Sequence, residues 1–206
     1  MIQVSNVKVY NFENAIIGMR NPMNSWDKSD SQGDILGKED IKLAQKLIHA
    51  GSPNDKFLRQ ILCSMQITAP IYWWKEMDTY KVATVANSTS TMHKIHSKPF
   101  ELSDFSFDDN PIFKNTEENI LKMLEELRQL YLSTRNQQNV DNPYWRALIQ
   151  LLPESYNQTR MWTANYSTLR EIYKWRQNHK LSEWRDFCKE ILKLPYAREL
   201  IAFEFL

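Results

Sequence analysis

The chain has 206 residues, a formal net charge of +1 at pH 7, 42% hydrophobic residues and 25% charged residues. This length and composition are typical of a globular protein with one domain, and they exclude a fibrous or largely disordered chain. A charge so close to neutral provides no long-range field that attracts polyanions, so the composition does not indicate general nucleic-acid binding.

Neither a secretory leader nor a membrane span is expected. The start, MIQVSNVKVY, lacks the basic region followed by an apolar region that marks a signal peptide. No stretch reaches the roughly 18 consecutive apolar residues of a membrane helix, so we predict a cytoplasmic protein. The two cysteines, Cys63 and Cys188, are far apart and have no CxxC spacing, which predicts buried thiols and not a disulfide or a metal site.

The N-terminal third alternates between strand and helix signals. The predicted elements are a strand over 4–10, a helix over 12–20, a loop over 21–37, a helix over 38–51 and a strand over 58–68. The loop is rich in Pro, Gly, Ser, Asn and Asp. It is either a lid that contacts a ligand or a plain solvated loop.

The stretch from Ala69 to His96 carries the densest aromatic cluster of the chain, followed by a polar run. The cluster, Tyr72-Trp73-Trp74, lies at the start of a predicted helix and serves either packing against a sheet or stacking on a ligand ring. The polar run, 87–91, offers five short hydrogen-bonding side chains next to Lys81. It is either an anion site or a solvated turn whose hydroxyls bond their own backbone.

Helices dominate the C-terminal half. An apolar stripe from Ile120 to Tyr131 marks a long helix that starts near Thr116, and the stripe faces either the core or a partner helix. The remaining predicted elements are a helix opened by Asp141 and Pro143 that ends at Leu152, a strand over 159–163, helices over 167–178 and 181–192, and a last helix after Pro195. The sequence thus predicts a helix-dominated α+β fold over residues 1–206, as a single domain with a small, mostly antiparallel sheet.

The residues alone reveal no catalytic constellation. The four glycines are spread singly, so a phosphate-binding loop and a dinucleotide fingerprint are both excluded, and no nucleophile elbow is found. His93 and His96 are three residues apart, but no Cys, Asp or Glu joins them at ligand spacing. Two surface histidines are therefore the simpler interpretation, and a metal site is the alternative.

Residues 69–92 resemble the signature segment of the flavin-dependent thymidylate synthases. That signature reads Arg-His-Arg-x-Ala-Ser-x-Asn-Glu-x-Ser-x-Arg-Tyr, and residues 79–92, TYKVATVANSTSTM, align with it without a gap. A second segment resembles the family's C-terminal half in the right order. It comprises Leu152-Pro153, TRMWTAN at 159–165 and LREIYKWR at 169–176.

The resemblance implies a homotetramer that holds FAD and deoxyuridylate, a pyrimidine deoxynucleotide, at its subunit interfaces. It assigns cofactor binding to Tyr80, Lys81 and Asn165. The substrate-binding residues that it implies are Glu76, Lys81, Asn87, Thr89 and Arg176. The catalytic residues are left unknown.

Several charged residues of the family pattern are replaced. Four positions where arginines are expected carry Thr79, Thr91, Ser167 and Ile149. The position where a glutamate is expected carries Asn87. Truncating one partner of a buried charge pair costs about 2–5 kcal/mol. The replacements therefore predict weak or absent FAD binding and lost or altered deoxyuridylate methylation, leaving a nucleotide-binding or scaffold role.

The alternative is an active but divergent flavin-dependent enzyme of deoxypyrimidine nucleotide metabolism that makes thymidylate from dUMP. In that case other cations have to substitute for the missing arginines. Lys94, Arg146 and Arg160 lie near enough in sequence to do so.

Overall fold

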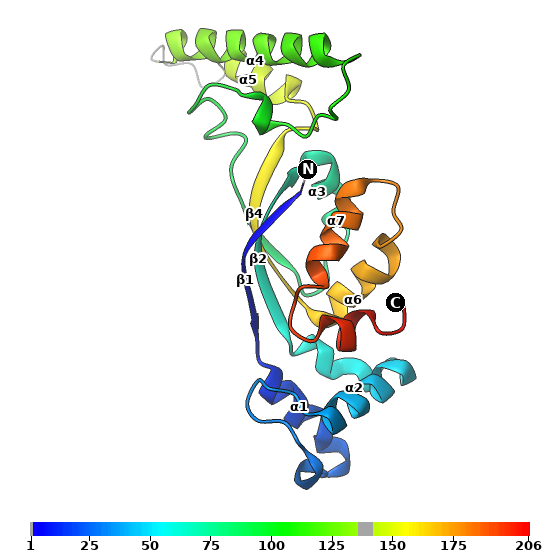
Figure 1. Ribbon diagram of the computed structural model, residues 1–206. Coiled ribbons are helices and arrows are strands. Elements are labelled where there is room, and N and C mark those ends of the chain that lie inside the picture. The colour runs from blue at the N-terminus through cyan, green and yellow to red at the C-terminus, as the bar shows by residue number, and fades with distance from the viewer. Residues whose placement is uncertain (1, 136–141) are drawn as a thin grey trace. The chain divides into compact units, whose positions relative to one another are not determined.

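The structure is a computed structural model that describes residues 2–135 and 142–206. Its main elements are β1 (Gln3–Tyr10), α1 (Phe12–Arg20), α2 (Lys38–Ala50), β2 (Leu62–Pro70), α3 (Ile71–Met77), β3 (Val85–Ser88), α4 (Lys114–Thr134), α5 (Pro143–Leu151), β4 (Asn157–Asn165), α6 (Tyr166–Arg176) and α7 (Ser182–Ile191) (Figure 1). The predicted helix-dominated α+β fold is confirmed.

The four strands form one sheet with the order β1-β2-β4-β3. Hydroxyl pairs across β2 and β4 show their register, because Ser64 Oγ meets Thr163 Oγ1 at 2.6 Å and Thr68 Oγ1 meets Thr159 Oγ1 at 2.7 Å. From the first pair to the second, the residue number rises by four on β2 and falls by four on β4. The two strands are therefore antiparallel. The predicted small, antiparallel sheet is confirmed as well.

The chain divides into two compact units, and the long strands β2 and β4 contribute residues to both. Unit 1 contains residues 68–77 and the described part of 88–160, whereas unit 2 contains residues 2–67, 78–87 and 161–206. The single domain over residues 1–206 stays a prediction.

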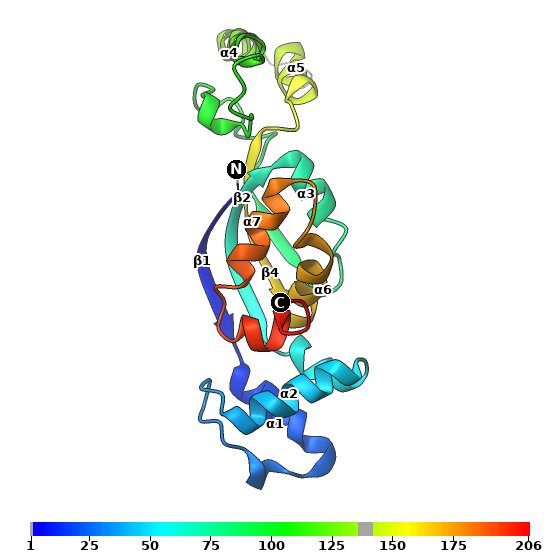
Figure 2. The same cartoon turned by 45° about the vertical axis from the view of Figure 1, so that its right-hand side comes forward.

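In unit 2, helices cover one face of the strands. Alternate residues of β2, Cys63, Met65 and Ile67, are buried, as period-two alternation requires. Helices α6 and α7 lie along this face (Figure 2), and Phe187 of α7 meets Trp162 of β4 edge-on with 6.3 Å between ring centroids. Cys63 and Cys188 are both buried and unbridged, and burial raises the pKa of each thiol to about 12. The prediction of buried thiols is therefore confirmed.

In unit 1, α4 and α5 lie side by side (Figures 1 and 2) and share an apolar core. Leu124 of α4 and Leu148 of α5 are fully buried there. The other buried members of this cluster are Ile95, Phe100 and Phe105. Most of the stripe over 120–131 packs against the cluster, so the stripe is core within the unit, with Leu130 still 44% exposed.

The tryptophans of the central stretch also serve packing. Trp73 and Trp74 on α3 are both 0% exposed, and their rings meet edge-on at 4.9 Å. The indole N–H of Trp74 donates to the Gln158 carbonyl oxygen at 2.9 Å, and the Arg160 guanidinium lies 4.2 Å from the centroid of the Trp74 ring. A buried ring is not available as a stacking platform, so these two rings act in helix-to-sheet packing.

Several boundaries differ from those predicted. The strand expected from Leu58 begins at Leu62, because residues 54–59 form a 3-10 helix. The short strand β3 was not expected, and the last helix is a π-helical turn over Arg198–Ala202. The cap of α5 is Asn142, whose side chain accepts from the backbone N–H groups of residues 144 and 145, whereas Asp141 lies outside the described residues. Within residues 2–135 and 142–206, each helix is too short or too polar to cross a lipid bilayer.

Candidate functional site

Two of the predicted site residues meet in unit 2. The Arg176 Nε–H at the end of α6 donates to the Tyr80 hydroxyl oxygen at 2.9 Å. The same guanidinium lies 4.7 Å from the ring centroid of Trp184 on α7 and 5.6 Å from that of Tyr80. A guanidinium stacked on aromatic faces and hydrogen-bonded at Nε is held in one orientation. Arg176 therefore fastens the segment 78–87 to α6 and α7.

Asn165, a predicted cofactor residue, is the N-cap of α6. Its side-chain oxygen accepts from the Thr168 backbone N–H at 2.9 Å, and the side chain is buried. The Thr168 hydroxyl lies within hydrogen-bonding distance of both this oxygen, at 3.2 Å, and the Val82 carbonyl oxygen, at 3.3 Å. Capping satisfies a backbone donor that the helix itself cannot satisfy, so Asn165 has a structural task in this chain.

The other predicted site residues are distributed over both units. Lys81 and Asn87 belong to unit 2 and are exposed. Glu76 on α3 and Thr89, which directly follows β3, belong to unit 1. Within unit 2, the described contacts thus connect Tyr80 with Arg176, and the assignment of all seven residues to a ligand stays a prediction.

The polar run over 87–91 is partly strand and partly turn. Asn87 and Ser88 end β3, and the Thr89 backbone N–H donates to the Thr159 carbonyl oxygen at 2.9 Å. Ser90 Oγ accepts from the backbone N–H groups of Met92 and His93 at 3.2 and 3.0 Å. The Ser90 hydroxyl therefore bonds to nearby backbone groups, as expected if the run is a solvated turn and not an anion site.

Unit 1 has a cavity of about 330 Å³ beside this run. Thr89, Ser90 and Thr91 line it, together with Lys94 and Lys98 from the segment that follows. The lysine that the sequence placed next to the run was Lys81. Within unit 1 the cations of the cavity are instead Lys94 and Lys98.

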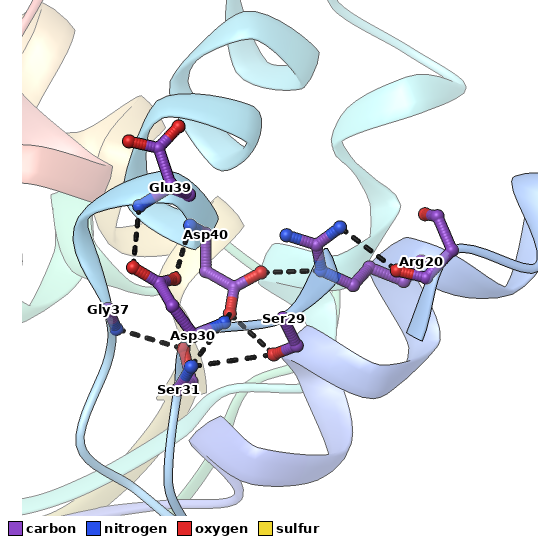
Figure 3. Close-up of polar contacts among 8 residues, drawn as sticks. Arg20, Ser29, Asp30, Ser31, Gly37, Glu39 and Asp40 are labelled. Carbon is purple, nitrogen blue, oxygen red and sulfur yellow. Dashed lines mark hydrogen bonds and ion pairs between the residues drawn. The ribbon is translucent and has the colours of Figure 1, made fainter. Parts of the chain in front are cut away.

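A buried carboxylate, Asp40, lies in the first turn of α2 and was not predicted from the sequence (Figure 3). Asp40 is 0% exposed and accepts from Arg20 Nε, Ser29 Oγ and Ser31 Oγ, each at 2.6 Å. The backbone N–H groups of residues 30 and 31 add bonds at 3.2 and 3.1 Å. Burial favours a raised pKa, but the bonds from Ser29, Ser31 and Arg20 outweigh it and lower the pKa of Asp40.

Asp30 continues this network at the start of α2. Its carboxylate accepts from the backbone N–H groups of Glu39 and Asp40, both at 3.0 Å. Gly37 leaves the room for it, because a Cβ at this position would lie 2.1 Å from Asp30 Cγ. Asp30 and Asp40 thus tie the loop 21–37 to α2. The acidic first turn of that helix was visible in the sequence, but nothing in the sequence marked Asp40 as buried.

The two histidines of the central stretch lie in different environments. His93 is exposed, whereas His96 is half-buried with its ring 4.8 Å from that of Tyr131. Burial, aided by nearby cations, lowers the pKa of His96. In the described part of the chain, no three His, Cys, Asp or Glu side chains are grouped so that they could hold a metal ion.

The arrangement of elements defines the fold of the flavin-dependent thymidylate synthases, as comparison with solved structures shows. Thymidylate synthase X from Helicobacter pylori, in a crystal structure with FAD and dUMP, matches with a TM-score of 0.75 and 18% identity over 98% of this chain and 97% of its own. Flavin-dependent thymidylate synthase ThyX from the same organism, complexed with FAD and dUMP, matches with a TM-score of 0.73 and 19% identity over 96% of this chain and 98% of its own. No family model and no curated protein matches the sequence. The resemblance read from the sequence is thus confirmed at the level of the fold.

Proposed function

We propose that this chain is a ThyX-like protein that has lost deoxyuridylate methylation and keeps a nucleotide-binding or scaffold role. The fold supports the ThyX-like part, since the match extends over nearly the whole chain and both matched structures hold FAD and dUMP. The loss of methylation rests on the side chains at the positions that the resemblance assigns to ligands.

The observation that carries the proposal is that Arg176 already contacts other side chains of this chain. Four of the arginines expected in the family pattern are replaced, by Thr79, Thr91, Ser167 and Ile149. Arg176 remains, but its Nε–H is bonded to Tyr80 and its guanidinium lies over Trp184. The Nε–H of Arg176 can donate to a nucleotide only if it gives up the Tyr80 hydroxyl, and that exchange reduces the net binding free energy.

The residues at the predicted cofactor positions fit FAD poorly. The Asn165 oxygen caps α6, and the Tyr80 hydroxyl accepts from Arg176. Lys81 is the one cation among the three, and an ammonium does not reproduce the bidentate grip of arginine on a phosphate. These contacts support weak or absent FAD binding.

Lys81 and Asn87 support a residual nucleotide site, because both are exposed in unit 2. Lys81 supplies a positive charge and Asn87 supplies an amide donor and acceptor. A pyrimidine deoxynucleotide carries complementary groups, namely a phosphate and the carbonyl oxygens of its base. We therefore place residual binding at these two side chains.

The proposal is tested with freshly purified protein. We expect no stoichiometric flavin absorbance and no rescue of a thymidine-requiring bacterial strain. A matched variant that carries Thr79→Arg, Asn87→Glu, Thr91→Arg and Ser167→Arg together is expected to gain flavin absorbance, because the scaffold is retained. Yellow unmodified protein that rescues the strain would establish the alternative, an active divergent enzyme.

Calorimetric titration of the same preparation with dUMP separates nucleotide binding from a pure scaffold role. If the residual site exists, Lys81→Ala weakens binding, whereas Lys46→Ala, an exposed lysine of α2 in the same unit, leaves it unchanged. Absence of heat at millimolar dUMP leaves the scaffold role.

A further inference from the structure

We propose that a second cavity of unit 1, which we call the acidic cavity, docks a basic amphipathic segment of a partner protein. The acidic cavity is formed by the segment 102–111 and the first turn of α4, and its volume is about 480 Å³. All of its lining residues belong to unit 1. They lie outside the predicted flavin and nucleotide set, so the inference goes beyond the proposed function and holds whether or not methylation is lost.

One wall of the acidic cavity is apolar and rigidly supported. Phe105 is 6% exposed, and its ring stacks on that of Phe107 with 5.2 Å between centroids and 10° between planes. Phe105 also meets Tyr156 edge-on at 5.6 Å, which fixes the stacked pair on the core of the unit. Leu102 joins the lining and is 45% exposed. Packed rings of this kind present a stable surface to an apolar side chain.

Exposed apolar side chains continue this surface beyond the cavity. Ile112 and Phe113 are 80% and 54% exposed, and they lie in the chain between the lining residues Pro111 and Lys114. The turn that presents them is closed by the Phe113 backbone N–H, which donates to the Asn110 carbonyl oxygen at 3.0 Å. Neighbouring exposed apolar side chains mark surfaces that bind other proteins. An apolar surface that extends past the cavity suits a peptide segment better than a small ligand.

The charges of the acidic cavity require a cationic occupant. Asp108, Asp109 and Glu117 line it, and none of the three has an ion-pair partner among residues 2–135 and 142–206. Lys114 contributes the opposing charge of the lining. The wider segment 101–118 contains six acidic residues and one lysine, although the whole chain has a net charge of +1. A surface with such an excess of one sign attracts a basic partner and repels an acidic one.

A basic amphipathic helix satisfies both requirements of this surface. Helices of this kind bind by placing apolar side chains into a groove at helical spacing. The carboxylates come from two elements, since Asp108 and Asp109 precede α4 and Glu117 lies on it. Cations at more than one position along a segment can therefore be paired here. A single small amine matches only part of the charge.

The test uses a fluorescein-labelled peptide of leucine and lysine at helical spacing, titrated with the full chain and followed by fluorescence anisotropy. We expect binding that weakens as the salt concentration rises, because exposed charges are screened. A matched peptide with glutamate in place of lysine should not bind. Neither peptide contains a nucleotide or flavin group, so the result is independent of the proposed function.

Variants of the lining charges should move the affinity in opposite directions. We expect Asp108→Asn with Asp109→Asn to weaken binding about tenfold or more. Lys114→Gln removes the opposing charge and should tighten binding several-fold, a gain that local unfolding does not produce. The matched control is Glu118→Gln with Glu126→Gln, the same change of charge on exposed residues of α4 that do not line the cavity. It should alter the affinity less than the Asp108 and Asp109 variant does.

Leu102→Gln tests the apolar wall and should also weaken binding. The melting temperatures of the ligand-free variants should stay unchanged, since Leu102 is 45% exposed and the two aspartates have no ion pair to lose in the described part of the chain. The proposal is overturned if the unmodified protein does not bind the peptide, if the aspartate variant binds as tightly as its control, or if the glutamate peptide binds equally well. Hexylamine binding as tightly as the peptide would assign the cavity to a small amine. A change of oligomeric mass in the aspartate variant would assign it to a second copy of this chain, and either result would contradict the proposal.

Discussion

Asp40 is the residue on which the conformation of the loop 21–37 depends. Its buried carboxylate accepts from three side chains and two backbone N–H groups, and it pairs with Arg20, which is 5% exposed. Removing one partner of a buried ion pair leaves an uncompensated charge and costs about 3–5 kcal/mol. We expect Asp40→Asn to lower the free energy of unfolding by about this amount in urea titrations.

The control for this variant is Asp27→Asn in the same loop, since Asp27 is exposed. It should change the unfolding free energy by no more than about 0.5 kcal/mol. The pKa of Asp40 is lowered in the folded state. Its stabilisation is therefore present above the unfolded pKa of about 4 and is lost as the pH falls through the lower native pKa. The difference between the unmodified protein and Asp40→Asn should shrink on acidification, and a difference that grows would contradict the assignment.

Single residues were the least predictable level of the structure. The sequence placed Tyr80 and Arg176 in one site through the family resemblance, and the two side chains do meet. It gave no indication that Arg176 is held by Trp184 or that Asp40 is buried, because both depend on contacts between residues far apart in the chain. Lys94 appeared only as a possible substitute for a missing arginine, and the cavity beside it was not predicted at all.

At the scale of elements, α6 begins at a cap that the resemblance assigns to flavin binding. Replacing an Asn cap by Ala costs about 0.5–2 kcal/mol, whereas Asp accepts the same backbone hydrogen bond. We therefore expect Asn165→Ala to lower the melting temperature and Asn165→Asp to preserve it, as measured by circular dichroism of ligand-free protein. Equal melting temperatures for the Ala variant and the unmodified protein would show that the cap contributes no stability and would favour the ligand role.

The predicted helices and strands succeed or fail for identifiable reasons. Helices α1, α2, α6 and α7 were visible because each places apolar residues at helical spacing. Strand β3 was not, since all four of its residues are exposed and no apolar alternation marks them. Its extended conformation depends on pairing with β4, which adjoins it in the sheet. Pairing of this kind is a tertiary effect that local sequence does not show.

At the scale of the whole molecule, we expect a homo-oligomer, with a tetramer as the specific prediction. The large side chains of Val7 and Tyr10 on β1 are 43% and 47% exposed. Strand β1 stands at one edge of the sheet, and exposed edge strands readily pair with other chains. Light scattering at micromolar concentration should therefore give the mass of four 24.5 kDa chains. A mass of one chain would contradict the prediction and would weaken the idea of ligand sites at subunit interfaces.

The overall fold was the most predictable level. Two sequence segments in register with one family implied the arrangement that comparison with solved structures confirms at 18–19% identity. The division into two compact units could not be anticipated, because β2 and β4 each contribute to both and no linker composition marks the boundary. The ligand is the part that the fold leaves open, since the side chains at the family's binding positions have changed.

The double anchoring of the loop on α2 also determines where the chain tolerates a change of length. The first turn of α2 is bonded to Ser29, Asp30 and Ser31. A residue inserted between this segment and Asp40 would move the serine hydroxyls away from the Asp40 carboxylate, unless the loop tip absorbs the extra length. That tip is closed by two reciprocal backbone bonds between Gln32 and Ile35, and Gly33 has a φ of +56° with open space around it. Insertions and deletions in related sequences should therefore gather at residues 33–34 and spare residues 29–31.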